Sequence, residues 1–336
     1  TDEKVDDFTA EDFVFVHRNE ELLDEAYTAT SYAKDVWMHF KKNKGAVLGA
    51  IIIVAIILLA IIGPMISGYK ADAINLDVQS LPPRIQGIYK LGIFSGYEKG
   101  VDQYAAHGVS QAFYWFGTDT NGRDLFTRVW EGTRVSLIIA LSAVVIDIVI
   151  GMSYGLISGY FGGKVDMVMQ RFMEILNGIP TLVVVTLLGL VLPPGITSIV
   201  FALMITGWIG MARISRAEVL KLKESEFILA SRTLGAKNFS IIFKEVMPNI
   251  FGQLIVMSMF SIPNAIFTEA FLSFVGLGIQ APDASLGSLI SDGYKSLTGH
   301  PHIIMSAIIV LALLMLSFNL FADGIRDAFD PNQKQR

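Results

Sequence analysis

Long apolar runs alternate with shorter polar stretches along most of this chain. The first run covers residues 45–66, has no charged residue, and follows Lys41, Lys42 and Lys44. As a helix it would be about 33 Å long, enough to cross the hydrocarbon core of a bilayer. Because lysines gather on the cytoplasmic side of membrane spans, we expect this first span to run outward.

Five further apolar segments predict a multi-pass membrane protein with six spans and both termini in the cytoplasm. We place them at about 134–159, 166–191, 196–213, 251–277 and 303–323. Pro180 and Pro263 lie inside two of these segments. They are expected to break the third and fifth helices, because proline lacks an N–H and clashes with the preceding turn.

The polar segments complete this division of the chain. They are a cytoplasmic N-terminal tail (1–44), an extracytoplasmic loop (67–131) and a cytoplasmic C-terminal tail (331–336), placed around a transmembrane permease core (132–330). Within the first tail, residues 31–44 carry an apolar stripe that includes Trp37. Such a stripe is typical of a helix lying in the membrane interface, although an ordinary juxtamembrane extension also fits.

The longest polar interruption of the C-terminal half covers residues 213–250. It has seven basic residues, Arg213, Arg216, Lys221, Lys223, Arg232, Lys237 and Lys244. The loop at 278–302 has one lysine, Lys295. This contrast places 213–250 in the cytoplasm.

Apolar residues within this stretch recur at helical spacing. They form two groups, Phe227, Ala230 and Leu234, and then Phe239, Ile242, Phe243 and Val246. The pattern predicts two short amphipathic helices joined at Gly235, which can take the positive φ of a helix C-cap, with Pro248 ending the second helix. From periodicity alone, the segment is either a solvated connector on the membrane surface or a docking element.

Composition narrows the class of protein. The chain has 336 residues, of which 52% are apolar and 17% charged, and its mean hydropathy is +0.53. The net charge of −5 includes no basic tract for nucleic acid, and the absence of cysteine excludes disulfides and thiolate chemistry. Gly162-Gly163-Lys164 is not a phosphate-binding loop, because Ser158 and Val165 stand where glycine and Ser/Thr are needed. We therefore expect no cofactor or metal in this chain.

Polar residues within the apolar spans are candidates for a translocation path. They are Asp147, Asn177, Asn264, Glu269 and Asn319. Charged and polar groups are costly there and usually face protein or water. The alternative role is a hydrogen bond that fixes helix packing. For Glu269 and Asn319 we favour packing or gating. Gly151, Gly155 and Gly159 form a small-residue stripe of the kind that lets helices approach closely.

Several motifs together resemble one family. Leu229-Ala230-Ser231, Gly235 and Met247-Pro248 resemble the "EAA" loop of ABC importer permeases, with Leu229 in place of the usual Glu. FGTDTNGRD, GYFGGKVDMVMQRFMEILNGIP, TEAFLSFVGLG, PDASLGSLISDG and FNLFADGIRDAFDP are similar to segments of the C-type subunit of oligopeptide, dipeptide and nickel permeases. The resemblance covers residues 45–330. Asp147 departs from it, since the family has an apolar residue there.

This resemblance implies an all-α membrane protein with the six-helix type I ABC importer permease fold and a cytoplasmic coupling helix that docks into an ATPase. The coupling residues would be Glu226, Phe227, Ala230, Ser231, Leu234, Gly235, Phe239 and Pro248. The implied partners are a second, homologous permease, two cytoplasmic ATPases, an extracytoplasmic peptide-binding protein, a peptide substrate and membrane lipid. The chain would not itself be an enzyme, and it would lie in the plasma membrane of a bacterium.

Other functions stay open on the sequence alone. Within the family, the solute is a peptide, nickel or an oligosaccharide. From other classes, an ion-driven secondary transporter or a membrane scaffold remains, although we find no convincing internal repeat of the kind common in secondary transporters. Copurification of ATPase subunits would distinguish an ABC importer permease from a secondary transporter and from a scaffold.

The lysine asymmetry gives a prediction about topology. Single cysteines at Ser95 and Ser225 should react with an impermeant thiol reagent from opposite sides of the membrane, because the two loops lie on opposite sides. Since the chain has no native cysteine, each label reports one site. Labelling of both positions from outside intact cells would overturn the six-span arrangement.

Overall fold

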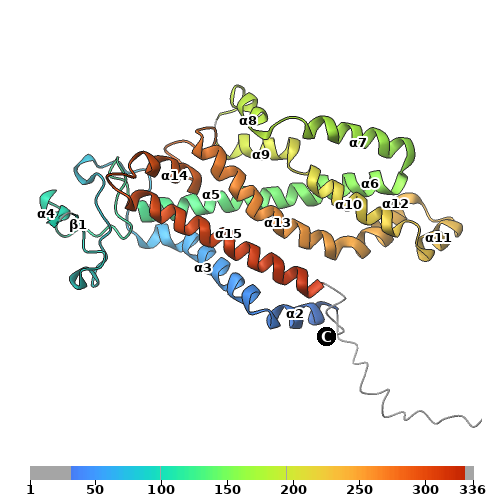
Figure 1. The fold of residues 1–336 in the computed structure, drawn as a ribbon, viewed down its shortest axis with the longest axis horizontal. Helices are drawn as coiled ribbons and strands as arrows, with labels where there is room; N and C mark the ends of the chain where they lie inside the picture. The colour runs from blue at the N-terminus through green and yellow to red at the C-terminus, as the bar shows by residue number, and fades with distance from the viewer. Residues whose placement is uncertain (1–31, 99, 194, 330–336) are drawn as a thin grey trace, which may run out of the picture.

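Helices running along one long axis make up most of the molecule (Figure 1). The computed structural model describes residues 32–98, 100–193 and 195–329. Residues 1–31 of the expected N-terminal tail (1–44) and the whole expected C-terminal tail (331–336) therefore lie outside the described residues. Within the described ranges, five helices are long and apolar enough to cross a membrane: Lys44–Ile66, Leu125–Phe161, Ile196–Leu222, Asn238–Phe274 and His302–Phe329. A bent pair, Gly163–Asn177 and Thr181–Gly189, provides a sixth span if it is counted as one.

The spans divide into labelled elements. They are α3 (Lys44–Ile66), α5 (Leu125–Ile146), η4 (Asp147–Met152), α6 (Ser153–Phe161), α7 (Gly163–Asn177), α8 (Thr181–Gly189), α9 (Ile196–Thr206), α10 (Ile209–Leu222), α12 (Asn238–Ile241), η5 (Ile242–Val246), α13 (Met247–Phe274) and α15 (His302–Phe329). The smaller elements are α2 (Tyr32–Lys42), η2 (Leu76–Val78), η3 (Tyr89–Leu91), β1 (Tyr97–Glu98), β2 (Val101–Asp102), α4 (Gln103–Ala106), α11 (Glu226–Thr233) and α14 (Leu286–Lys295). Both η4 and η5 are π-helical turns.

The prolines of the spans act in different ways. Pro180 has ψ 133° and separates α7 from α8 at a 71° bend, so the predicted break there is confirmed. The prediction for Pro263 was wrong, because α13 continues through it. Membrane helices tolerate proline where neighbouring groups satisfy the freed carbonyl.

The prediction that Pro248 ends a short helix was also wrong. Pro248 lies in the first turn of α13, and helix runs from Asn238 to Phe274. The π turn η5 directly precedes it, and the Asn249 side-chain amide donates to the Glu245 carbonyl at 2.7 Å. The wider turn and this extra donor accompany the proline within a continuous helix.

Polar contacts set where α5 begins and join it to α3. The second span begins as helix at Leu125, earlier than the expected 134, because the Asp124 side chain accepts from the Thr127 N–H at 2.9 Å and caps α5. In α3, Pro64 cannot donate to the Ala60 carbonyl. Arg134 of α5 occupies that carbonyl instead, through Nε at 3.2 Å and Nη2 at 2.8 Å. A backbone group that proline leaves free inside the bundle is thereby satisfied.

The small-residue stripe brings α6 and its preceding turn against α10. A Cβ added to Gly151 would lie 2.8 Å from the Met211 Cβ, and one added to Gly159 would lie 2.9 Å from the Val219 Cβ. At Gly155 the nearest side-chain atom would be the Ser215 Cβ at 2.5 Å. These separations leave no room for a side chain, so the two helix backbones are in close contact.

The segment 67–124 folds over one end of the bundle with a small core of its own. Val78, Leu81, Tyr104 and Tyr114 form this core. The Arg84 guanidinium lies over the rings of Tyr104 and Tyr89, 4.8 Å from each centroid. Burial in this core also raises the pKa of the Tyr114 hydroxyl to about 12. Because aromatic and cation–π contacts hold it together, the segment is an ordered cap.

The close contact at Gly155 gives a prediction about stability. Gly155→Ala should lower the thermal stability of the purified protein, by about 1–3 kcal/mol, because the added methyl overpacks the contact with α10. Gly189→Ala is the matched control, since a Cβ at that helical glycine meets nothing within 4 Å. Equal melting temperatures for the two variants would show that the contact is not close in the protein.

Candidate functional site

The helix α11 lies at the tip of the bundle, at the end opposite β1 and α4 (Figure 1). One residue, Ile228, anchors it, with no exposed surface. Ile228 packs in a buried cluster with Leu156 of α6 and Val219 of α10, which also includes Ile241 and Ile242. The inner face of α11 is thus fixed to the ends of two membrane helices.

Its outer face, together with Phe239 of α12, presents apolar groups that none of the described residues covers. The side chains of Phe227, Phe239 and Leu234 are 43%, 63% and 87% exposed. Ala230 is also exposed on this face. We call Phe227, Ala230, Leu234 and Phe239 the outer stripe. Of the other expected coupling residues, Glu226, Gly235 and Pro248 are exposed and Ser231 is half-buried.

Gly235 ends α11 in the manner predicted. Its φ is +80°, in the left-handed region that favours glycine. The Ala236 N–H donates to the Ser231 carbonyl, and the Gly235 N–H to the Arg232 carbonyl, both at 3.0 Å. These two bonds form a Schellman motif, so the predicted cap is confirmed and fixes the direction in which the chain leaves α11.

Tyr160 connects α11 to the membrane helices, a contact that the sequence analysis missed. The Arg232 guanidinium lies 4.8 Å from the centroid of the Tyr160 ring and donates to its hydroxyl at 3.3 Å. The same hydroxyl donates to the Asn238 side-chain oxygen at 3.2 Å. Tyr160 and Arg232 are 72 residues apart, so no local pattern could have paired them.

A second polar cluster joins the same ends of α6, α7 and α10. Arg216 donates to both carboxylate oxygens of Asp166, each at 2.6 Å. The Ser158 hydroxyl donates to Asp166 at 2.6 Å, and Gln170 donates to Ser158 at 3.1 Å. A bidentate arginine–carboxylate pair fixes geometry as well as charge, so these helices are held in register next to α11.

A cavity of about 340 Å³ lies between the helices further along the bundle. Of the expected path residues, Asp147 and Asn264 line it. Thr181, Thr206 and Ser261 line it as well, although the sequence analysis had not selected them. A hydroxyl within an apolar span gives a weaker signal than a charge, which is why they were missed.

The other expected path residues lie elsewhere. Glu269 is fully buried, and its two oxygens accept from Ser136 at 2.7 Å and Ser273 at 2.8 Å. It therefore joins α5 to α13 by hydrogen bonds. Asn177 and Asn319 are exposed and do not line this cavity.

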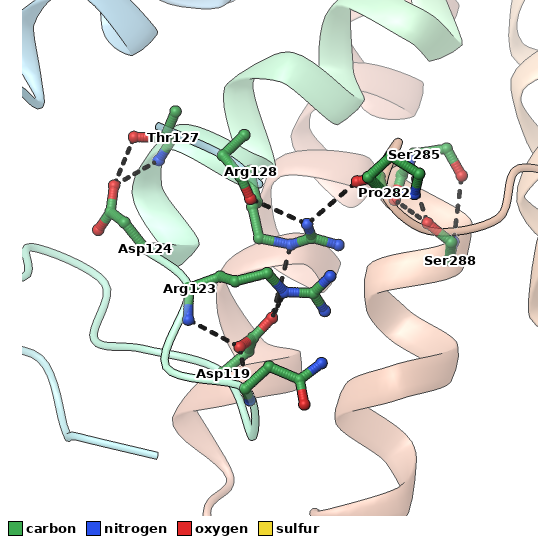
Figure 2. A network of polar contacts seen from close by, with 10 residues as sticks. Asp119, Arg123, Asp124, Thr127, Arg128, Pro282, Ser285 and Ser288 are labelled. Carbon is green, nitrogen blue, oxygen red and sulfur yellow. Dashed lines mark hydrogen bonds and ion pairs between the residues drawn. The ribbon is translucent and has the colours of Figure 1, made fainter. Parts of the chain in front are cut away.

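The FGTDTNGRD motif is a buried polar network at the opposite end of the bundle (Figure 2). Asp119 accepts from Arg123 Nε at 2.7 Å and lies 3.6 Å from Arg128 Nε. Arg128 donates to the carbonyls of Ala71 at 3.1 Å and Pro282 at 3.4 Å. Burial raises the pKa of Asp124, while hydrogen bonds from Thr127 act in the opposite direction. The network ties 67–124 to the start of α5 and to the segment before α14.

Two family models match the chain. One, described as binding-protein-dependent transport system inner membrane component, matches residues 151–335. The other, described as the N-terminal TM domain of oligopeptide transport permease C, matches residues 31–83. Together they cover the first span and the membrane region from residue 151 onward.

Curated relatives match along most of their length. The dipeptide transport system permease protein DppC of Bacillus subtilis (strain 168) is 41% identical over 319 residues, which is 95% of this chain and 91% of the relative. DppC of Lactococcus lactis subsp. cremoris (strain MG1363) is 45% identical over 320 residues, 92% and 93% of the two chains. The oligopeptide transport system permease protein OppC of Escherichia coli (strain K12) is 36% identical over 301 residues, 90% and 91% of the two chains.

A solved structure shares the fold. The MetNI methionine ABC transporter, in an inward-facing conformation, has a chain that aligns with a TM-score of 0.51 and 18% identity. The alignment covers 60% of this chain and 97% of that chain. At this identity the likeness shows the fold alone, and it confirms the predicted type I importer permease architecture.

The cap at Gly235 gives a prediction about the order of α11. Gly235→Val should loosen the helix, because a β-branched residue at positive φ is strained by about 1–3 kcal/mol. Hydrogen exchange of the amides in 226–241 should become faster. Gly235→Asn is the control, since asparagine tolerates this conformation, and its exchange should stay close to wild type. Equal exchange for Val and Asn would contradict a conformational role for the glycine.

Proposed function

The chain belongs to the C-type subunits of oligopeptide and dipeptide ABC permeases, and on this premise we propose that it passes peptides into the cytoplasm by alternating access. It is a multi-pass membrane protein. Hydrolysis of ATP would take place on separate ATPase subunits, and this chain would provide half of the path. The relatives named for dipeptide and oligopeptide transport support a peptide as the solute.

The observation that carries this proposal is the outer stripe at the tip of the bundle. An apolar face left exposed on a short helix, with the opposite face anchored by Ile228, suits docking into a groove on a partner. We assign that partner as a cytoplasmic ATPase. The basic residues of 213–250 support a cytoplasmic position for this end, with 67–124 on the outer side.

The structural connection between α11 and the cavity is short and rigid. Gly210, Met211 and Ile214 of α10 line the cavity, and α10 continues to Leu222, three residues before Ser225 at the start of α11. The Tyr160–Arg232 contact and the packing of Ile228 join the same elements laterally. A displacement of α11 would therefore move a wall of the cavity. The ATPases would shift the equilibrium through their different contacts with the two states.

The remaining partners follow from the same premise. A second, homologous permease would complete the path, as the family resemblance implies. An extracytoplasmic peptide-binding protein would dock at the end formed by 67–124, where the buried Asp119 network holds the segment in place. Selection among peptides would then depend on both that protein and the cavity.

Docking through the outer stripe predicts the effect of one substitution. Ala230→Glu should abolish or strongly reduce copurification of the ATPase subunits and ATP-dependent uptake in proteoliposomes. A charge would be buried in the interface without a partner, which typically costs about 3–5 kcal/mol. Insertion in the membrane should survive, because Ala230 is exposed on α11, outside the spans.

Leu229→Glu is the matched control for this test. It adds the same charge one residue away on α11, but off the outer stripe, and it restores the residue usual in the family motif. It should retain the ATPases and uptake. Wild-type ATPase binding and uptake by Ala230→Glu would remove α11 as the docking element, whereas equal loss in both variants would show only that extra charge on this helix is not tolerated.

A further inference from the structure

Asp147 differs from the other acidic groups within the spans. Its side chain is 5% exposed, yet it lines the cavity between the helices. By contrast, Glu269 has a hydrogen bond to each oxygen from a serine. None of the ion pairs formed by the described residues includes Asp147, and the neighbouring polar group is Ser261. A carboxylate is thus placed beside a space without a cation to balance it.

The rest of the cavity wall is neutral. Thr181, Thr206, Ser261, Asn264 and Thr268 contribute hydroxyl and amide groups, and the other lining residues are apolar or glycine. Among the described lining residues, Asp147 is therefore the one ionisable side chain. A single negative charge with low-dielectric walls attracts positive charge and raises its local concentration.

The backbone at this point also departs from regular α-helix. Asp147 is the first residue of the π turn η4, which ends at Met152, between α5 and α6. Such single turns within α-helices frequently occur at functional sites. The chain continues from Asp147 directly into α6. This helix packs on α10 through Gly155 and carries Tyr160, which contacts Arg232 of α11. The carboxylate is therefore attached to the elements that a partner at α11 would displace.

We propose that Asp147 forms a subsite for the ammonium group of a peptide in transit, either its free N-terminus or a lysine side chain. This inference rests on the proposed function and adds the chemistry that the cavity recognises. An ammonium group would balance the buried carboxylate, while the hydroxyl and amide oxygens of Ser261 and Asn264 can accept further N–H bonds. The volume of about 340 Å³ is enough for one end of a peptide.

The first test measures the charge of the cavity without relying on transport. Thr206→Cys places a thiol on the cavity wall of a chain that has no other cysteine. The probes are trimethylammonioethyl and sulfonatoethyl methanethiosulfonate, and intact mass of this chain within the purified complex gives each rate. The cation-to-anion rate ratio should fall about tenfold in Asp147→Asn and be retained in Asp147→Glu. Ser110→Cys, exposed in 67–124, is the control whose ratio should not respond.

The second test identifies the source of the ammonium group. Uptake of trialanine, N-acetyl-trialanine and N-acetyl-Ala-Lys-Ala is compared in proteoliposomes containing the complete complex, with Asp147 and Asp147→Asn side by side. Any preference of the binding protein is the same in both and cancels. A fall of about tenfold in uptake of trialanine relative to N-acetyl-trialanine identifies the N-terminus, and a fall confined to the lysine peptide identifies the side chain.

Two results would overturn the subsite. One is a thiol rate ratio that is the same for Asp147 and Asp147→Asn, and the other is an equal change in uptake of all three peptides. If the wild-type complex takes up none of the peptides, the proposed function fails and the thiol ratio alone decides whether the cavity attracts cations. The two failures are therefore distinguishable.

Discussion

The close contact between α6 and α10 is the constraint on which the candidate site depends. Gly151, Gly155 and Gly159 have no side chains, so the two backbones meet without intervening atoms. Because α10 both lines the cavity and continues toward α11, the position of α10 determines where α11 lies relative to the cavity. Tyr160, at the end of α6, can reach Arg232 since the helices are this close.

Polar groups within the spans fall into two kinds. The Ala60 carbonyl released by Pro64 and the carboxylate of Glu269 are each satisfied from another helix, by Arg134 and by Ser136. Such groups join helices, because an unpaired polar group in the membrane is costly. Asp147 faces a cavity without a counter-charge among the described residues, and its neighbouring polar group is Ser261. The proposed ammonium subsite would supply the missing positive charge.

The two ends of the molecule each combine paired charges with exposed apolar groups. At the 67–124 end, charged groups are buried and paired with one another, as in the contacts of Asp119 with Arg123 and Arg128. At the α11 end, apolar groups such as Leu234 and Phe239 remain exposed. Apolar groups are exposed at the 67–124 end as well, as at Leu91 and Ile93, and the α11 end has its own charge pair, Arg216 with Asp166. Both ends therefore offer apolar surface to the partners proposed for them.

The sequence by itself determined the membrane class, the positions of the spans, the Gly235 cap and the family, because these depend on local hydropathy, local backbone preference and motif spacing. It misjudged Pro248 and Pro263, since whether a proline breaks a membrane helix depends on the groups that neighbouring elements supply. Only the tertiary structure separated Asp147 from Glu269, two carboxylates that look alike in sequence. One faces a cavity and the other two serines, and that difference is set by helix packing between residues up to 133 positions apart. The same reason hid the Tyr160–Arg232 contact and the cavity hydroxyls until the helices were placed together.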